Sequence, residues 1–194
     1  MKVVRHLVGI CISLLAALAV AQEKGADVGA HGPSQSAADY LREYTGADIA
    51  FLAAGQVKDT FQRDNLATLL QYKTDPLMVL NLSGSQIRTA LERSLSLYPQ
   101  SNTSFLQLSG LEVTFSRAVT TKSRLLSVVV GGAKLEDAKM YRVAMPSQLG
   151  RGGLGYFKVW DKTAIAKTYD DVTIESVLKG KRLTETTPRW LAQD

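Results

Sequence analysis

Short apolar runs separated by helical segments constrain the fold of this chain more than any other feature of its sequence. The runs at 49–54 and 77–82 are bounded by glycine, proline or polar residues, as is typical of buried strands. The run at 111–115 alternates apolar and polar residues, which indicates a half-buried strand. Strands and helices follow one another in mixed order. The sequence therefore predicts a mixed domain of the α/β or α+β class.

Capping residues and apolar spacing predict where the helices begin and end. Ser36, with Asp39 in the capping-box position, opens a helix that ends at Gly46. Ser83 opens the clearest helix, which Tyr98 and Pro99 close. Two more helices are predicted, one beginning at Asp64 and a last one over 172–178; the further predicted strands are 105–108, 124–130 and 140–145.

The N-terminus has the pattern of a secretory signal peptide. Lys2 and Arg5 precede an apolar run at 7–20, and the small residues at 19–21 predict cleavage after Ala21. An uncleaved membrane anchor is the alternative. We therefore expect a secreted or periplasmic protein that has no membrane contact after cleavage. The predicted organisation is a signal peptide at 1–21, a flexible Gly/Ala/Ser/Pro linker at 22–35, a domain at 36–185 and a polar tail at 186–194.

The composition of the cleaved chain excludes most catalytic centres. Cleavage removes the one cysteine, Cys11, and leaves His31 as the remaining histidine. Thiol nucleophiles, disulfides, Cys-zinc sites and clusters of histidine ligands are thereby excluded, and no metal or cofactor is expected. Cleavage also removes Lys2 and Arg5 but no acid, which leaves a formal charge of +3. That charge is too small to indicate nucleic-acid binding.

Taken in order, several segments resemble the C-terminal domain of the secreted 5'-nucleotidase / 2',3'-cyclic phosphodiesterase / UDP-sugar hydrolase family. The resemblance extends over roughly 34–185, and its most specific parts are the Phe-Leu-Gln-Leu-Ser-Gly block and the later Gly-Gly-x-Gly-aromatic loop. It implies layered helices and mixed β-sheets. The segments that carry it are 46–50, 55–58, 82–84, 90–92, 105–110, 141–144 and 152–156.

The resemblance also implies that this chain has no catalytic residues of its own. In that family a separate metallophosphoesterase domain holds two metal ions, and the C-terminal domain binds the nucleoside part of the substrate. The sequence therefore predicts a non-catalytic binding or accessory protein linked to nucleotide catabolism, with a small anionic or nucleoside-like ligand. The alternative is the substrate-binding subunit of a split phosphoester hydrolase, whose metal-bearing domain is a separate partner chain. A purely structural remnant of the domain is a third interpretation.

The first part of the family's binding site is altered in this sequence. Its Asn-x-Gly-Gly-Ile-Arg loop, whose Asn contacts the base and whose Arg contacts the phosphate, corresponds to Ala53 through Lys58. Alanine cannot replace the amide of Asn, and Lys58 keeps the charge of Arg without its bidentate fork. The Pro-Phe pair that supplies a stacking ring corresponds to Tyr72 and Lys73.

The second part of the binding site is altered as well. The family's other stacking Phe corresponds to Gln148, and the Asp that holds the ribose corresponds to Leu154. Contacts of this kind contribute about 1–3 kcal/mol each, so their joint loss predicts a degenerate nucleotide site. Arg151 and Lys58 are candidates for binding an anion, and Tyr156 is either core or a ring that stacks on a ligand. The candidate site residues are Lys58, Tyr72, Lys73, Gln148, Arg151, Gly152, Gly153 and Tyr156.

The segment Gly150–Gly155 also matches the Gly-x-Gly-x-x-Gly pattern of dinucleotide-binding loops. In such sites the glycines open a helix whose N-terminus faces the pyrophosphate. Here the aromatic segment 156–160 follows, which has the character of a strand. A tight loop that lines the cleft of the family is therefore the preferred interpretation.

Overall fold

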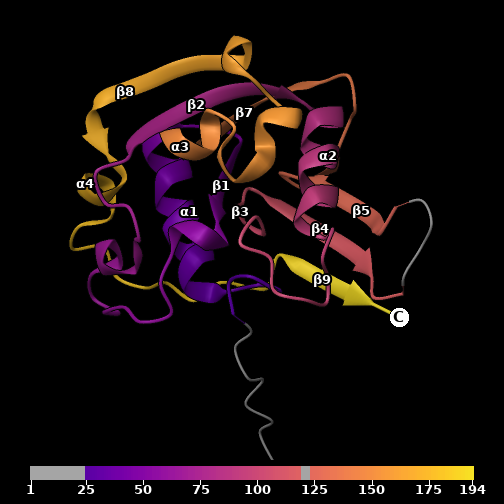
Figure 1. Cartoon of the computed structure of the whole chain (residues 1–194), viewed down its shortest axis with the longest axis horizontal. Coiled ribbons are helices and arrows are strands. Elements are labelled where there is room, and N and C mark those ends of the chain that lie inside the picture. The colour runs from indigo at the N-terminus through magenta and orange to yellow at the C-terminus, as the bar shows by residue number, and fades with distance from the viewer. Residues whose placement is uncertain (1–24, 119–122) are drawn as a thin grey trace, which may run out of the picture.

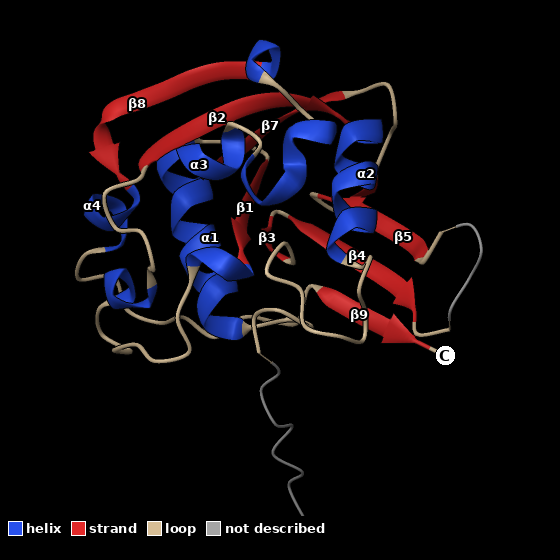
Figure 2. Ribbon diagram, viewed as in Figure 1, coloured by secondary structure: helices blue, strands red, loops and turns tan. Residues whose placement is uncertain are grey.

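The computed structural model describes residues 25–118 and 123–194, so the predicted signal peptide lies outside the described residues. The described part has the predicted mixed α+β class, with two sheets and helices packed on them (Figures 1 and 2). One sheet has the strand order β3-β1-β7-β2-β8 and the other β6-β5-β4-β9. The strands are β1 Ile49–Ala53, β2 Pro76–Ser83, β3 Leu106–Ser109, β4 Leu111–Ser116, β5 Leu125–Val130, β6 Ala133–Lys134, β7 Met140–Pro146, β8 Ile165–Thr173 and β9 Trp190–Gln193.

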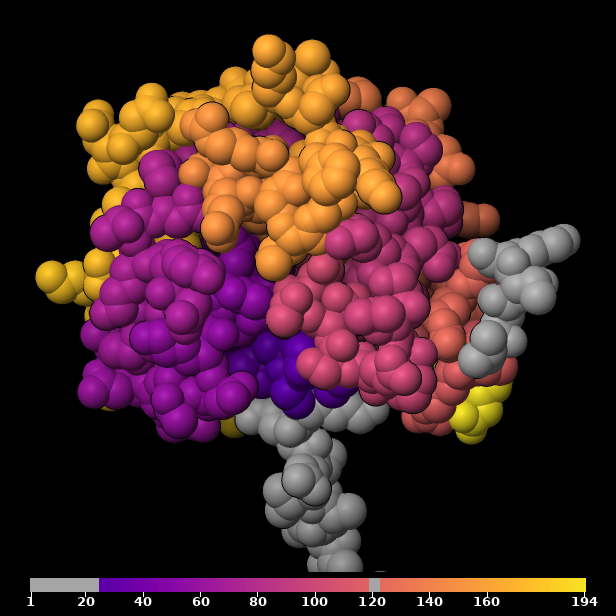
Figure 3. Space-filling view, in the orientation of Figure 1, coloured from indigo at the N-terminus to yellow at the C-terminus, as the bar shows by residue number. Residues whose placement is uncertain are grey.

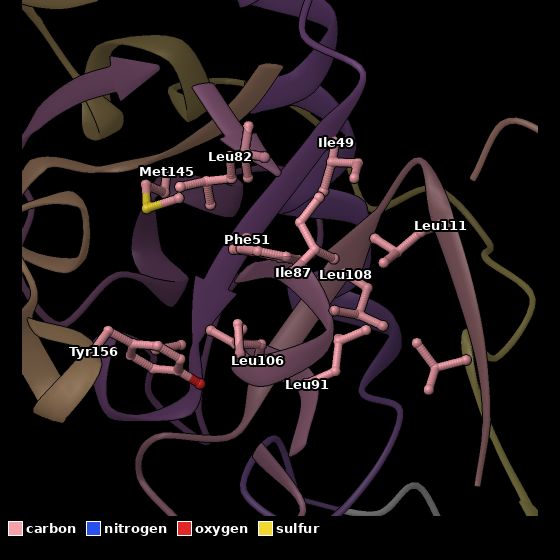
Figure 4. Packing of buried hydrophobic residues seen from close by; sticks show 14 of the residues in the cluster. Ile49, Phe51, Leu82, Ile87, Leu91, Leu106, Leu108, Leu111, Met145 and Tyr156 are labelled. Atoms are coloured by element: carbon pink, nitrogen blue, oxygen red, sulfur yellow. The ribbon is translucent and has the colours of Figure 1, made fainter. Parts of the chain in front are cut away.

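The helices occupy both faces of the larger sheet. On β1, Ile49 and Phe51 belong to the core cluster that contains α2, whereas Ala50 and Leu52 belong to the cluster that contains α1 (Figure 4 shows part of the first). Successive side chains of a strand point to opposite faces, so this division follows from the continuous apolar run. The helices are α1 Gly32–Thr45, α2 Gly84–Ser94, α3 Ser147–Gly150 and α4 Ile174–Leu178, with 3₁₀ segments η1 Ala54–Gln56, η2 Leu66–Leu69, η3 Gly153–Lys158 and η4 Lys162–Ala164.

The beginning of α2 is confirmed at the predicted residue. The Ser83 hydroxyl accepts a hydrogen bond from the Gln86 amide at 3.2 Å, and the Gln86 side chain accepts one from the Ser83 amide at 2.9 Å. This reciprocal capping box satisfies two amides that have no partner inside the helix. The helix ends at Ser94, before the predicted stop at Tyr98 and Pro99.

The predicted start of α1 and the predicted linker are wrong. The helix begins at Gly32 with Pro33 in its first turn, where a fixed φ and a missing amide hydrogen cost nothing. Ser36 is therefore a buried residue inside the helix. Residues 25–31 are also part of the domain, because the Gln107 side chain donates hydrogen bonds to the carbonyls of Ala26 and Gly29, both at 2.7 Å.

The predicted polar tail is also wrong, because it contains strand β9. Trp190 pairs in parallel with Val113 of β4 and is 5% exposed. Its indole nitrogen donates a hydrogen bond to the Leu106 carbonyl at 2.7 Å. Residues 186–189 lead into this strand, and Arg189 forms a 2.7 Å ion pair with Asp39 of α1. The last residues thus hold the smaller sheet against the N-terminal helix.

Three further elements differ from the sequence-based prediction. The helix predicted from Asp64 is the short 3₁₀ segment η2, and the last helix, α4, begins at Ile174 because residues 172–173 belong to β8. Strand β8 has no counterpart in that prediction. It lies at the edge of the larger sheet and, among the described strands, pairs only with β2, so most of its side chains stay accessible and its sequence lacks an apolar run.

Gly110 allows the chain to pass from one sheet to the other. It lies between β3 and β4 with a φ of 79°, and a side chain there would overlap the backbone oxygen of Asp48. Only glycine adopts this conformation at such a close approach without strain. The turn brings the start of β4 near α1, which packs on β3, and this matters for the surface described below.

Candidate functional site

The candidate residues come from loops at one edge of the larger sheet. Strands β1 and β7 are parallel neighbours, so the loops that follow them begin at the same edge. One loop is η1 with Lys58, and the other runs through α3 and η3 and carries Gln148 to Tyr156. The carboxyl ends of parallel strands are a common position for ligand sites. The topology therefore brings the two parts of the predicted site together.

Leu154 fills the space between these two loops. Its side chain lies against Gly55, where an added Cβ would be 3.4 Å from Leu154 Cδ2. Leu154 has a φ of 53°, which is unusual for a residue with a side chain, and it packs partly buried against the core. In the space-filling view the orange segment that carries this loop lies against the pink segment around residue 100 (Figure 3).

The backbone of Leu154 is held in place by two side chains that the sequence analysis missed. Its carbonyl accepts hydrogen bonds from Arg93 Nη2 at 2.5 Å, from Arg93 Nε at 3.2 Å and from the Ser104 hydroxyl at 2.9 Å. A side chain at Gly155 would overlap Arg93. These contacts join residues far apart in the sequence, and no local pattern indicates them.

Tyr156 is part of the core and has no surface available for a ligand. It is 0% exposed, and its ring stacks on Trp160 with centroids 4.7 Å apart and 8° between the planes. The hydroxyl donates a 2.6 Å hydrogen bond to the Ser104 carbonyl, and the Arg93 guanidinium lies 5.3 Å from the ring centroid. Burial raises the pKa of Tyr156 far above its usual value. The core interpretation is therefore correct, and ligand stacking by this ring is wrong.

Lys58 and Tyr72 are exposed at the same end of the site. The Lys58 amide donates a 2.8 Å hydrogen bond to the Leu69 carbonyl, which brings the η1 loop beside the segment that carries Tyr72. The Tyr72 ring is 49% exposed. Lys73 is directed to α4 instead, where its Nζ lies 3.4 Å from a carboxylate oxygen of Glu175.

Gln148 and Arg151 are also exposed, and the position of Gln148 is set by Asp75. The Asp75 carboxylate accepts a hydrogen bond from the Ser147 hydroxyl at 2.6 Å and one from the Gln148 amide at 3.1 Å. Asp75 lies just before β2 and ties the start of α3 to that strand. The sequence analysis did not identify it, because an Asp before Pro76 also fits an ordinary turn.

The Gly150–Gly155 segment does not form a dinucleotide-binding loop. It leads into the 3₁₀ segment η3, in which Leu154 and Gly155 have left-handed backbone angles, so no α-helix begins there. This also corrects the strand character expected for the aromatic residues that follow. A side chain at Gly152 would lie 2.7 Å from the Phe157 Cα, and one at Gly153 would lie 2.5 Å from the Gln148 carbonyl oxygen. The two glycines serve close packing within the loop.

Over residues 25–118 and 123–194, no group of three or more His, Cys, Asp or Glu residues is arranged to hold a metal ion. In the same part of the chain, no helix has the length and apolar character needed to span a bilayer. The candidate site consists of exposed side chains on and beside two loops, and Leu154 fills the space between those loops.

Sequence comparisons identify relatives along much of the chain. A family model described as "5'-nucleotidase, C-terminal domain" matches residues 16–161. A 5'-nucleotidase-related protein of Glossina morsitans morsitans is 31% identical over 128 residues, which cover 58% of this chain and 23% of the relative. The 5'-nucleotidase of Mus musculus is 31% identical over 111 residues, which cover 53% of this chain and 19% of the relative.

Solved structures share the fold over most of the chain. A 5'-nucleotidase precursor from Thermus thermophilus superposes with a TM-score of 0.69 at 22% identity, covering 85% of this chain and 36% of that chain. The NAD nucleotidase of Haemophilus influenzae superposes with a TM-score of 0.65 at 15% identity, covering 89% of this chain and 37% of that chain. The chain thus spans about a fifth of the length of the curated relatives and just over a third of these structures.

Proposed function

Because this chain belongs to the 5'-nucleotidase C-terminal domain family, we propose that it is an exported binding or accessory protein of nucleotide catabolism that does not hydrolyse phosphoesters itself. The proposal includes a degenerate nucleotide site around Lys58, Tyr72, Gln148 and Arg151. Export rests on the signal-peptide pattern of residues 1–21.

The position of Leu154 is the observation that carries this proposal. At the position that the resemblance matches to the family's ribose-binding acid, this chain has an apolar side chain that packs against Gly55. A nucleoside would have to displace Leu154 from its partly buried position, and the loop is fixed by the hydrogen bonds of Arg93 and Ser104 to the Leu154 carbonyl. The exposed cations Lys58 and Arg151 remain available for an anionic group.

Calorimetry on residues 22–194 tests the degenerate site. Titration with AMP, adenosine, UDP-glucose and inorganic phosphate is expected to show no saturable nucleotide binding in the micromolar range, because the stacking rings, the ribose acid and the base-reading amide are replaced. Phosphate release from AMP in the presence of Mn²⁺ is expected to equal the protein-free rate. A 5'-nucleotidase with its metal domain serves as the positive control. Micromolar AMP binding, or metal-dependent phosphate release by this chain, contradicts the proposal.

An exposed aromatic residue beside the site favours a second function, that of a substrate-binding subunit in a split phosphoester hydrolase. Phe157 is 65% exposed, and it lies on the loop that also carries the exposed cations Arg151 and Lys158. Aromatic residues and Arg are enriched at protein interfaces relative to the rest of the surface. The partner would be a separate chain with a metallophosphoesterase domain.

Affinity capture from the native organism tests the second function. The tagged chain is expected to co-elute with metal-dependent phosphoesterase activity, and Phe157→Ala is expected to reduce that activity at least about tenfold, as for an interface anchor. Leu97→Ala is the matched control, since Leu97 is 50% exposed and follows α2 instead of lying on this loop. If no phosphoesterase activity is retained, or if the two variants retain it equally, the split-enzyme function is wrong.

A further inference from the structure

A hollow of about 370 Å³ lies where the two sheets meet, away from the loops of the candidate site. We call it the Arg42 hollow. Its walls come from α1, from the β3–β4 turn and the start of β4, from β5 with the glycine turn after it, and from the residues before β9. The lining residues are Asp39, Arg42, Gly110, Leu111, Glu112, Val129, Gly131, Gly132, Thr187 and Arg189.

Most polar groups in the wall of the Arg42 hollow bind one another. Asp39 forms the 2.7 Å ion pair with Arg189 and accepts a 2.6 Å hydrogen bond from the Ser109 hydroxyl. Arg189 also donates a 2.5 Å hydrogen bond to the Leu108 carbonyl. The side chains of Arg189 and Asp39 are only 16% and 29% exposed, so this pair is a fixed and electrically neutral part of the wall.

Two charged groups of the lining are not used in this way. Arg42 donates a 2.8 Å hydrogen bond from Nε to the Ser109 hydroxyl, which orients the guanidinium, but its two outer nitrogens form no bond within the described part of the chain. The Glu112 carboxylate likewise has no hydrogen bond or ion pair with any described residue, and it is more than 4 Å from any cation there. Glu112 pairs with Val129 across β4 and β5, so both side chains lie on the face that lines the hollow.

We propose that the Arg42 hollow binds a small zwitterion of the α-amino acid class. The two outer guanidinium nitrogens of Arg42 would donate two parallel hydrogen bonds to the carboxylate of the ligand. Glu112 would accept hydrogen bonds from its ammonium group. Val129, which is half-buried on the same face as Glu112, offers an aliphatic surface for an apolar side chain. Side chains added to the turn at Gly131 and Gly132 would meet nothing within 4 Å, so this side of the hollow is open for entry.

The charge balance of the lining selects a zwitterion over a simple anion or cation. The Asp39–Arg189 pair contributes no net charge, which leaves one fixed cation and one carboxylate. An anion on Arg42 would be repelled by Glu112, and a cation on Glu112 would be repelled by Arg42, whereas a ligand with both charges satisfies both. The volume is at the small end of the range for ligand sites, which excludes a nucleotide-sized ligand from full enclosure.

Calorimetry with L-leucine, N-acetyl-L-leucine and L-leucinamide tests the charge requirement. L-leucine is expected to bind the full chain, and each derivative, which lacks one of the two charges, is expected to bind at least about tenfold more weakly, as for the loss of a hydrogen bond between charged groups. A panel of other free amino acids then defines the side chain. No heat from any amino acid at millimolar concentration, or equal affinity for leucine and its two derivatives, overturns the proposal.

The variant Glu112→Gln tests the site without risk to the fold, because Glu112 is exposed and has no partner to lose among the described residues. It is expected to weaken L-leucine at least about tenfold and to strengthen N-acetyl-L-leucine, because that anion is no longer repelled by the Glu112 carboxylate. Glu136→Gln, at another exposed position, is the matched control and is expected to bind as the native chain does. Arg42→Lys keeps the charge but loses the paired nitrogens of the guanidinium, and is expected to weaken the binding of both ligands.

Native affinity in Glu112→Gln assigns the binding elsewhere and refutes this site. Because these ligands carry no nucleotide group, the outcome is independent of the nucleotide titrations.

Discussion

Replacing Trp190 with alanine is expected to lower the free energy of unfolding by about 3–5 kcal/mol, as for other buried large-to-small substitutions. Trp190 packs against Phe105 at 4.8 Å and Phe115 at 5.9 Å between ring centroids, and its indole bonds the Leu106 carbonyl. The substitution removes these contacts, opens a cavity and leaves a buried carbonyl without its partner. Urea unfolding followed by circular dichroism measures the change.

Leu191→Ala is the matched control for this prediction. Leu191 is the next residue of β9 and is 42% exposed, so it tests the strand without the buried ring. We expect a loss of less than about 1 kcal/mol. If both variants lose stability equally, the contribution comes from the pairing of β9 with β4, and the role given to the Trp190 side chain is wrong.

Replacing Tyr156 with alanine is expected to have an effect of similar size, about 3–5 kcal/mol. The ring is fully buried between Trp160 and the Arg93 guanidinium, and its hydroxyl bonds the Ser104 carbonyl. Removing the ring therefore removes packing contacts that hold the loop carrying Leu154 in place. Thermal and urea unfolding measure the loss.

Two further variants separate the contributions of Tyr156. Tyr156→Phe keeps the stacked ring but leaves the Ser104 carbonyl without the hydroxyl, and is expected to cost about 1–2 kcal/mol. Phe157→Ala changes the neighbouring exposed ring and is expected to cost less than about 1 kcal/mol. A Tyr156→Ala variant as stable as Phe157→Ala shows that Tyr156 does not support the loop.

The central elements of this fold could be predicted because local sequence determines them. The apolar runs of β1 and β2 mark strands buried on both faces, and the Ser83 capping box marks the first residue of α2. The edge strands β8 and β9 lack this signal. β8 carries charges on accessible positions, and β9 is a four-residue strand in which only the tryptophan is buried, so neither has a pattern that predicts a strand.

The sequence indicates which loops carry the candidate residues, but not how the side chains between those loops pack. The position of each loop follows from the parallel pairing of β1 with β7 and from the resemblance in sequence. Whether the space between the loops is open depends on Leu154, Arg93 and Ser104, which meet only after the chain has folded. Burial of Tyr156 has the same origin. A substitution pattern can show that ligand contacts are missing, but it does not show what replaces them.

The contacts between the early and late parts of the sequence determine when the domain can form during synthesis. Gln35, Ser36 and Asp39 of α1 bond residues 184–189, and β4 gains its parallel neighbour only from β9. A nascent chain that has been synthesised only as far as residue 180 therefore lacks the strand that completes the smaller sheet and the partners of the buried polar groups on α1. Contacts of such long sequence separation slow folding. If the chain is exported as we propose, this delay would keep it unfolded, and thus competent to cross the membrane, until its late residues are available.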